Sequence, residues 1–333
     1  MRLRRVLCTV AAGGLLTATA ACAAEDEGGG TEEEAVDYPT EQLTIMAPAA
    51  PGGGWDQTSR TLQQVMETEG LAPEGVEVVN VSGAGGTIGL AQTAQETDPH
   101  QLMTMGLVML GAVLTNDSPA TLEDVTPIAR LTSEYEILVV PADSEFETLD
   151  DFMSALEEDP GSVPIAGGSA GGTDQILAGL LAQAAGADPA QVNYVAFSGG
   201  GESLAALLGG SVAAGISGIG EYAAQVEAGE LRALGVSAPE RLDIIDTPTF
   251  MEQDVDVELA NWRGMVAPPD LSDEQRDAIV AFFDDVNASD GWQDALERSG
   301  WDNTYLAGDE YATFLQDEQV RVTEILEELG LVT

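Results

Sequence analysis

Four clusters of glycine are the residues of this sequence best suited to hold a ligand. They lie at 52–54, 83–86, 167–172 and 199–201, and each follows a short apolar run. Glycine leaves backbone N–H groups open to a ligand, and a helix that starts at such a loop adds about half a positive charge. One cluster alone predicts a tight turn. Four at equivalent positions favour a site for an anionic group held by backbone amides.

The elements that carry these loops alternate from residue 38 onward, as short strand-like runs followed by helical patterns. Such alternation predicts an α/β fold with parallel or mixed sheets covered by helices, whose loops gather beyond the carboxyl ends of the strands. Ser272 and Gln275 form a capping box that begins a helical tail. The expected strands are 43–47, 76–81, 102–107, 136–140, 163–166, 193–197, 212–216 and 231–236, and the expected helices include 58–69, 149–158, 174–185, 203–208 and 222–228.

The composition excludes several kinds of chemistry. The chain has 333 residues with 58 acidic and 11 basic side chains, a formal charge of −47, and every basic residue is arginine. Without lysine there is neither a P-loop lysine nor a Schiff-base nucleophile. One histidine, His100, and two cysteines, Cys8 and Cys22, cannot build a multi-histidine metal site or a zinc ribbon. The charge also repels phosphate backbones. We therefore expect no cofactor, no metal and no nucleic-acid partner.

Groups for catalysis are sparse. A Ser-His-Asp triad would need His100, which the pattern places in an exposed surface turn. The neighbouring acids Asp150 and Asp151 point different ways on a helix and are typical of a solvated face. The glycines at 83–89 resemble a dinucleotide fingerprint that is one residue too long. We expect no catalytic residues and no enzyme, with a secreted hydrolase that uses serine or carboxylate residues as the alternative.

The N-terminus predicts export. Residues 1–21 have the basic start, the apolar stretch and the small residues of a signal peptide. The residues before Cys22 resemble a lipobox, which predicts lipid attachment at Cys22 and a membrane anchor at the cell surface or in the periplasm. Ordinary cleavage near Cys22 is the alternative. Residues 22–38, rich in acids and glycine, predict a flexible tether.

Several motifs together resemble one family, the substrate-binding proteins of tripartite tricarboxylate transporters, or Bug-type receptors. The Gly-Gly-Gly-Trp-Asp run at 52–56 is similar to the family's first-loop signature, and Asn80 with the loop after it is similar to its second. The resemblance covers roughly residues 40–330, through segments 47–60, 80–86, 168–174, 194–201, 246–249 and 262–268.

The resemblance implies a two-lobed periplasmic-binding-protein fold, type II-like, that closes on a carboxylate. Residues 39–140 and 261–333 would form lobe 1 and residues 141–260 lobe 2, with the ligand between them. The implied function is an extracytoplasmic solute-binding lipoprotein, a monomer that captures citrate or a similar acid and delivers it to a large and a small membrane subunit. A sensor receptor for a two-component kinase is a further alternative.

The site residues expected on this basis come from both lobes. Amides in the first lobe would receive carboxylate oxygens, and hydroxyls would donate from the second. Asp56 either caps the first helix or holds a bridging water, and Arg60 and Arg263 are candidate counter-charges. The full expected set of ligand-binding residues is Gly53, Gly54, Trp55, Asp56, Ala84, Gly85, Gly86, Ser169, Thr173, Asp174, Ser198, Gly199 and Arg263.

Overall fold

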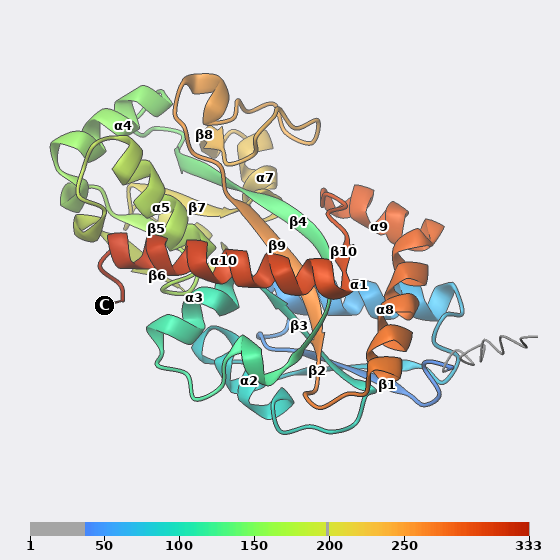
Figure 1. The fold of residues 1–333 in the computed structure, drawn as a ribbon. Coiled ribbons are helices and arrows are strands. Elements are labelled where there is room, and N and C mark those ends of the chain that lie inside the picture. Colours follow the sequence, from blue (N-terminus) through green and yellow to red (C-terminus); the bar gives the residue numbers. More distant parts are fainter. Residues whose placement is uncertain (1–36, 198–199, 333) are drawn as a thin grey trace, which may run out of the picture. The chain divides into compact units, whose positions relative to one another are not determined.

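The structure, a computed structural model, describes residues 37–197 and 200–332 (Figure 1). The expected signal peptide, Cys22 and nearly all of the tether lie outside the described residues, and so do Ser198 and Gly199. No helix in the described ranges is long and apolar enough to cross a membrane. Ten strands of this part form one mixed sheet, against which the helices pack. The α/β class predicted from the sequence is confirmed.

The first strands pair in parallel, as the alternation of strands and helices predicts. β1 (Leu43–Ala47) lies between β2 (Val76–Asn80) and β3 (Gln101–Gly106). The sequence did not predict that the apolar run at 102–114 divides in two at residue 106. The connecting helices are α1 (Gly54–Thr68), α2 (Thr87–Thr93) and α3 (Leu107–Thr115), and a 3-10 turn, η1 (Ala84–Gly86), precedes α2.

One long strand, β4 (Thr126–Pro141), joins the two ends of the sheet. Its first part, up to Tyr135, pairs with β9 (Ala260–Ala267), and its second part, from Glu136, pairs with β7 and β8. The sequence predicted only the second part as a strand and did not predict β9. β9 also pairs with β3, and both of its pairings are antiparallel.

The middle of the chain builds the other end of the sheet. β5 lies between β6 and β7 and is parallel to both, while β8 pairs with β4. The elements are α4 (Leu149–Glu158), β5 (Ile165–Gly167), α5 (Thr173–Ala184), β6 (Tyr194–Ala196), α6 (Gly200–Leu208), β7 (Ala214–Gly218), α7 (Ile219–Glu227) and β8 (Leu231–Val236).

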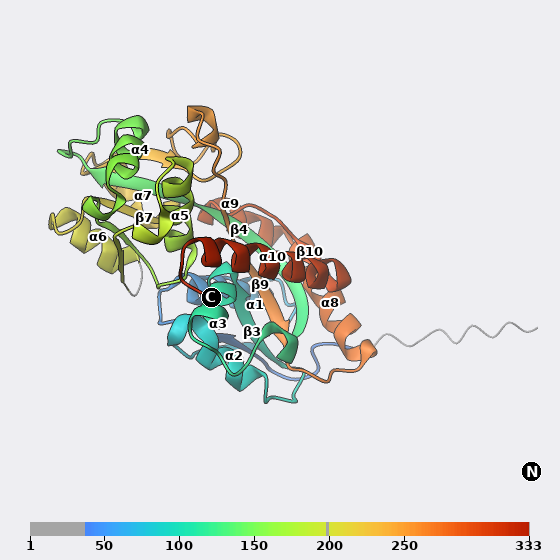
Figure 2. The same ribbon diagram turned by 60° about the vertical axis from the view of Figure 1, so that its left-hand side comes forward.

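The chain ends in helices that return to the first strands. The capping box predicted at Ser272 and Gln275 is present at the start of α8. The last helix, α10, packs against α3 and β4, and the residues after it reach α5, where Leu329 covers Gly179 (Figures 1 and 2). The bounds are α8 (Asp273–Ala288), α9 (Asp290–Ser299), β10 (Leu306–Ala307) and α10 (Gly308–Glu328).

His100 is buried, so the expectation of an exposed histidine is wrong. It is 8% exposed, and its ring stacks on Tyr38 with the centroids 5.1 Å apart. Its Nε2 accepts from the Thr40 amide at 3.2 Å, and its Nδ1 lies 3.1 Å from an Asp98 oxygen. The Tyr38 hydroxyl donates to the Pro99 carbonyl at 3.0 Å. These contacts fasten residues 38–40 to the turn before β3.

Candidate functional site

The first glycine loop is held in place by Asp56, which is 3% exposed. One of its oxygens accepts the Gly52 amide at 2.7 Å, and the other accepts Asn80 Nδ2 at 2.8 Å and lies 2.9 Å from Arg60 Nε. Burial alone would raise the pKa of Asp56, but the hydrogen bonds from these partners outweigh it and lower the pKa below its usual range. Asp56 and Arg60 therefore position the loop, and a direct ligand contact by Asp56 stays a prediction.

This loop leaves two amides for a ligand. The Gly53 amide donates to the Ala50 carbonyl at 3.0 Å, which closes a turn. The amides of Gly54 and Trp55, the first two of α1, donate to no other described residue. Unused N–H groups at a helix start bind anions well. Of the residues predicted in this loop, Gly54 and Trp55 are thus better placed to donate than Gly53.

The second loop has a left-handed backbone that glycine makes possible. Ala84, Gly85 and Gly86 have φ values of 49°, 60° and 93°. The Gly86 amide closes a turn onto Gly83 at 3.0 Å, and a Cβ on Gly86 would lie 2.7 Å from the Trp55 ring. Trp55 therefore packs over this loop, which brings the first two glycine clusters together. The Ala84 and Gly85 amides donate to no other residue within the described ranges.

Sequence reasoning missed a third helix start, that of α3. Val108 lies next to Gly172, where a Cβ would be 3.5 Å from Val108 Cγ1. One turn further on, a Cβ on Gly111 would overlap the carbonyl oxygen of Gly171. The third glycine cluster thus packs directly on α3. Glycine at 106, at the end of a largely apolar strand, was the available signal for this helix start.

The third loop is held by a carboxylate in the way that the first one is. The Gly168 amide donates to Asp174 Oδ2 at 2.5 Å, and the Gly171 amide donates to Gln175 at 2.8 Å. Ser169 is exposed, while Thr173 is 1% exposed and its hydroxyl has no hydrogen-bond partner in the described part of the chain. Of the expected donors, Thr173 is therefore buried with unused hydrogen-bonding capacity.

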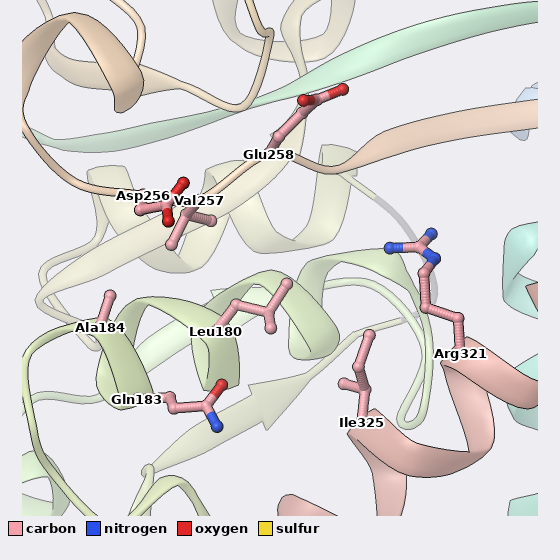
Figure 3. A pocket seen from close by; sticks show the side chains of 8 residues that line it. All are labelled: Leu180, Gln183, Ala184, Asp256, Val257, Glu258, Arg321 and Ile325. Atoms are coloured by element: carbon pink, nitrogen blue, oxygen red, sulfur yellow. The ribbon is translucent and has the colours of Figure 1, made fainter.

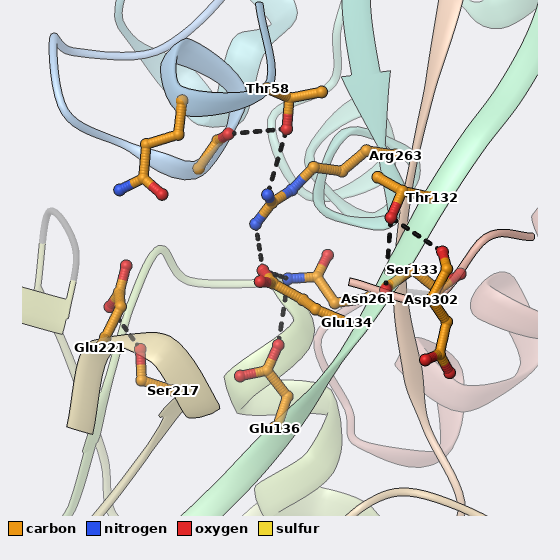
Figure 4. Close-up of polar contacts among 12 residues, drawn as sticks. Thr58, Thr132, Ser133, Glu134, Glu136, Ser217, Glu221, Asn261, Arg263 and Asp302 are labelled. Atoms are coloured by element: carbon orange, nitrogen blue, oxygen red, sulfur yellow. Dashed lines mark hydrogen bonds and ion pairs between the residues drawn. The ribbon is translucent and has the colours of Figure 1, made fainter. Parts of the chain in front are cut away.

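Arg263, a candidate counter-charge for the ligand, contacts the first loop from β9 (Figure 4). It is 6% exposed, its Nη1 donates to Thr58 Oγ1 at 3.2 Å, and a Cβ on Gly54 would meet its guanidinium group. Its Nη2 forms an ion pair with Glu134. The positive charge of Arg263 is therefore shared between the first loop and Glu134, a largely buried carboxylate that the sequence did not single out.

Three more carboxylates surround this pair. Asn261 Nδ2 lies 3.3 Å from Glu134 Oε1 and 3.1 Å from Glu136 Oε1, and Ser217 Oγ donates to Glu221 at 2.6 Å (Figure 4). With Asp174 these form what we call the acid cluster: Glu134, Glu136, Asp174 and Glu221. Glu134 and Glu136 lie two residues apart on β4, so they share one face of the strand. That spacing was the available signal.

Burial and the neighbouring charges raise the pKa values of three residues of the acid cluster, Glu134, Glu136 and Asp174. Burial raises the pKa of Glu134, although Arg263 opposes the rise, and burial with the neighbouring acids raises the pKa of Glu136 well above its ordinary value. Burial raises the pKa of Asp174 to about 7, against the hydrogen bond from Gly168 and with the help of Glu221 and Glu134. The cluster therefore holds protons at pH values where isolated carboxylates have lost them.

We expect Asp174→Asn to stabilise the ligand-free protein as the pH rises. The native carboxyl keeps its proton up to a pKa of about 7, and the unfolded one loses it near pH 4, so the wild type loses stability between these values. Asparagine keeps an acceptor for the Gly168 amide and does not titrate. Urea unfolding at pH 5, 6, 7 and 8 should show an advantage that grows to pH 7 and then levels off. Asp150→Asn, on the exposed start of α4, is the control. An advantage independent of pH would contradict this prediction.

Two cavities in the described part of the chain lie away from the glycine loops and the acid cluster. A cavity of about 250 Å³ lies between α5, the segment 256–258 and α10 (Figure 3). Another, of about 510 Å³, lies beside α4 and the end of α5. Neither is lined by a predicted site residue. Arg321, at the edge of the first, is paired with Glu318, which also accepts Trp262 Nε1 at 2.8 Å. Because neither cavity contains a predicted site residue, we do not assign the site to them. The glycine loops and the acid cluster are the candidate site.

Comparison with known proteins defines the class. The fold is that of a periplasmic binding protein: the periplasmic binding protein BugD matches with a TM-score of 0.77 at 20% identity, over 89% of this chain and 99% of BugD. MatC of Rhodopseudomonas palustris, solved with bound malate, matches with a TM-score of 0.71 at 24% identity, over 87% of this chain and all of MatC.

The sequence gives the family. The model of the tripartite tricarboxylate transporter family receptor, TctC, matches residues 59–331, so the chain belongs to this family. Protein BugT of Bordetella pertussis is 26% identical over 300 residues, which are 88% of this chain and 90% of BugT. The resemblance seen in the motifs is confirmed. The family is one of solute-binding receptors and not a class of enzymes, and its periplasmic members imply an exported protein.

Proposed function

We propose that this receptor captures a small carboxylate outside the cytoplasm and delivers it to the membrane subunits of a tripartite transporter. The observation that carries the proposal is the start of α1, where the unused amides of Gly54 and Trp55 lie beside the buried guanidinium group of Arg263. Amides at a helix start and an arginine are the groups that bind a carboxylate. The malate in MatC supports a carboxylate ligand by analogy.

The remaining parts of the proposal rest on the sequence and on strand pairing. Lobe 1 (residues 39–140 and 261–333) and lobe 2 (residues 141–260) would close on the ligand. The pairing partner of β4 changes between Tyr135 and Glu136, which supports a crossing from one lobe to the other within that strand. A lipid on Cys22 would anchor a monomeric receptor to the membrane. The family's first-loop signature favours citrate, whereas the acid cluster favours a ligand with less negative charge.

Thermal unfolding with a panel of ligands tests this function. We expect at least one among citrate, malate, succinate, aspartate and glutamate to raise the Tm of residues 37–333 by several degrees, because a ligand at 100 times its Kd adds about 2.7 kcal/mol to the free energy of unfolding. The methyl esters of the same acids, which lack the charge, should leave the Tm unchanged. Equal shifts from acid and ester, or no shift from any free acid, would contradict a carboxylate receptor.

A further inference from the structure

The last helix, α10, is fixed to the strands of the proposed lobe 1. Glu318 accepts Trp262 Nε1 of β9 at 2.8 Å, and the Phe314 ring lies edge-on to the Trp262 ring with the centroids 5.2 Å apart. The guanidinium carbon of Arg130, on β4, lies 4.3 Å from the centre of the Phe314 ring. A buried hydrogen bond and packed rings therefore join α10 to β4 and β9, and the helix should move with these strands.

The end of α10 contacts the proposed lobe 2 instead. Leu329 is 6% exposed, and its side chain covers Gly179 of α5, where a Cβ would lie 1.9 Å from Leu329 Cδ2. One turn further along α5, Gln183 Nε2 donates to Glu328 Oε2 at 2.9 Å. Glycine weakens the interior of a helix, but at position 179 its lack of a side chain makes the room that Leu329 occupies.

The contact with lobe 2 lies very close along the chain to a contact with lobe 1. Leu326 is fully buried, and a Cβ on Gly111 of α3 would lie 3.6 Å from Leu326 Cδ1. Leu329 comes three residues later and packs on α5. Less than one turn of helix thus joins the two lobes here, and the rise of an α-helix is fixed at about 1.5 Å per residue.

The end of α10 is also closed by hydrogen bonds, so it has no slack. The Gly330 amide donates to the Glu327 carbonyl at 3.0 Å, and the Leu331 amide donates to the Leu326 carbonyl at 2.9 Å. Gly330 has a φ of 67°, the left-handed conformation that ends a helix in a Schellman motif. Because this part of the chain cannot lengthen, Leu329 must leave α5 when the lobes part.

Before this contact, α10 and α5 are held apart by the cavity of about 250 Å³ (Figure 3). Leu180 and Gln183 line it from α5, Arg321 and Ile325 line it from α10, and segment 256–258, which leads into β9, forms the third side. The packing between the two helices is therefore concentrated at the end of α10. It can separate while the rest of each helix stays packed within its own lobe.

The contact also lies away from the candidate ligand site. Gly179 and Gln183 come six and ten residues after Thr173, the first residue of α5. These positions are about 9 and 15 Å further along the helix axis. A change at Gly179 can therefore alter how the lobes move without touching a predicted ligand-binding residue.

We propose that residues 328–331 act as a clasp that holds the two lobes together and must release before a ligand can enter or leave. The main part of this clasp is the Leu329 side chain, which is buried while the lobes are together and meets water when they part. The clasp thus regulates ligand exchange from outside the site. This inference rests on the proposed function, because it requires two lobes that open and close.

Changing glycine to alanine in two helices tests the clasp. In Gly179→Ala the new methyl group occupies the place of the Leu329 side chain, which must leave, although alanine is the better helix former. Gly220→Ala in α7 is the matched control, because a Cβ there meets nothing within 4 Å. Leu329→Ser releases the clasp without any change in α5. We expect both clasp variants, and not the control, to open the lobes.

The distance between two spin labels, one on each lobe, measures the opening without any ligand. The labels are attached at Gln64→Cys in α1 and Ala205→Cys in α6, both exposed positions, in the full chain with its two native cysteines replaced as Cys8→Ser and Cys22→Ser. The intact clasp should give one main distance. In both clasp variants the ratio of a longer to the shorter distance should rise at least tenfold, the scale for losing the burial of one leucine side chain.

Unchanged distances in both clasp variants would overturn the inference and leave the carboxylate receptor standing. An equal change in Gly220→Ala would overturn it as well, because the helix and not the clasp would then be the cause. If no acid of the panel binds, the proposed function fails, whereas longer distances in the clasp variants would still support the clasp.

Release of a bound acid should also become faster. Because a ligand leaves only when the lobes part, the acid among citrate, malate, succinate, aspartate and glutamate that raises the Tm most should dissociate about tenfold faster from Gly179→Ala than from Gly220→Ala. Stopped-flow measurements of the dissociation rate give this ratio. Equal or slower dissociation from Gly179→Ala would overturn the role of the clasp in ligand exchange.

Discussion

Arg263→Met is expected to lower the free energy of unfolding by about 3 kcal/mol at pH 8. The change removes the ion-pair partner of Glu134, whose side chain is 17% exposed, and leaves a largely buried charge beside Glu136. Burial already raises the pKa of Glu134 while Arg263 opposes it, so the variant pKa should rise further and the carboxyl should be protonated more readily. The deficit should therefore shrink at pH 5. Urea unfolding at both pH values measures it.

A second change separates the lost pair from lost packing. Glu134→Gln combined with Arg263→Met removes both charges, so the double variant should recover most of the stability that the single variant loses. The guanidinium group of Arg263 also lies 5.3 Å from the Trp301 ring, and that contact stays lost in both variants. If the double variant is as unstable as the single one, the packing of Arg263 matters more than its charge.

Gly111→Ala is expected to weaken ligand binding at least tenfold. In an ordinary helix this change stabilises by up to about 1 kcal/mol, because alanine is the better helix former. In α3, however, the new methyl group would overlap the Gly171 carbonyl, which is backbone and has little room to move. The third glycine loop must then move away from α3, and with it Thr173 and Asp174. Calorimetric titration of the best ligand from the panel would measure the loss.

The control for this change is another helical glycine, one whose nearest neighbour is a flexible side chain that can move away. A Cβ on Gly291 in α9 would lie 2.5 Å from Glu69 Oε1, the end of an exposed side chain that can turn away. Gly291→Ala should therefore keep the ligand affinity of the wild type. Unchanged affinity in Gly111→Ala would show that binding does not need the contact between α3 and the third loop.

The sequence predicted the strands and loops whose signals are local. A short apolar run, a glycine break and a helical pattern recur, and they correctly place β1, β2 and β5 with the helices after them. It missed the helix that begins at Leu107, because strand and helix are both apolar there and periodicity cannot divide the run. It also missed β9. This strand pairs with β3 on one side and β4 on the other, and both are distant in the sequence, so its position depends on tertiary folding.

Sequence reasoning named the glycine loops together with Asp56, Asp174 and Arg263 as candidate site residues, and it did not name Glu134, Glu136 or Glu221. The glycine loops can be recognised because clustered glycines mark turns in the local sequence, and Asp56 accepts the Gly52 amide from only four residues along the chain. The acid cluster is not visible in this way, since its members come from β4, α5 and α7 and only tertiary folding brings them together. The two-residue spacing of Glu134 and Glu136 was the available signal, but in a chain with 58 acidic residues such a spacing does not by itself separate a buried glutamate from a solvated one.

The stacked pair of Tyr38 and His100 has a mechanical consequence. Residue 38 lies five residues before β1, and the first glycine loop follows the other end of that strand. A force applied to the chain before residue 37 would act first on the stacked rings of Tyr38 and His100 and on the hydrogen bonds that join Tyr38 to Pro99 and Thr40 to His100. It would act on β1 only after these contacts. These contacts therefore reduce the force that the N-terminal segment can transmit to the first glycine loop.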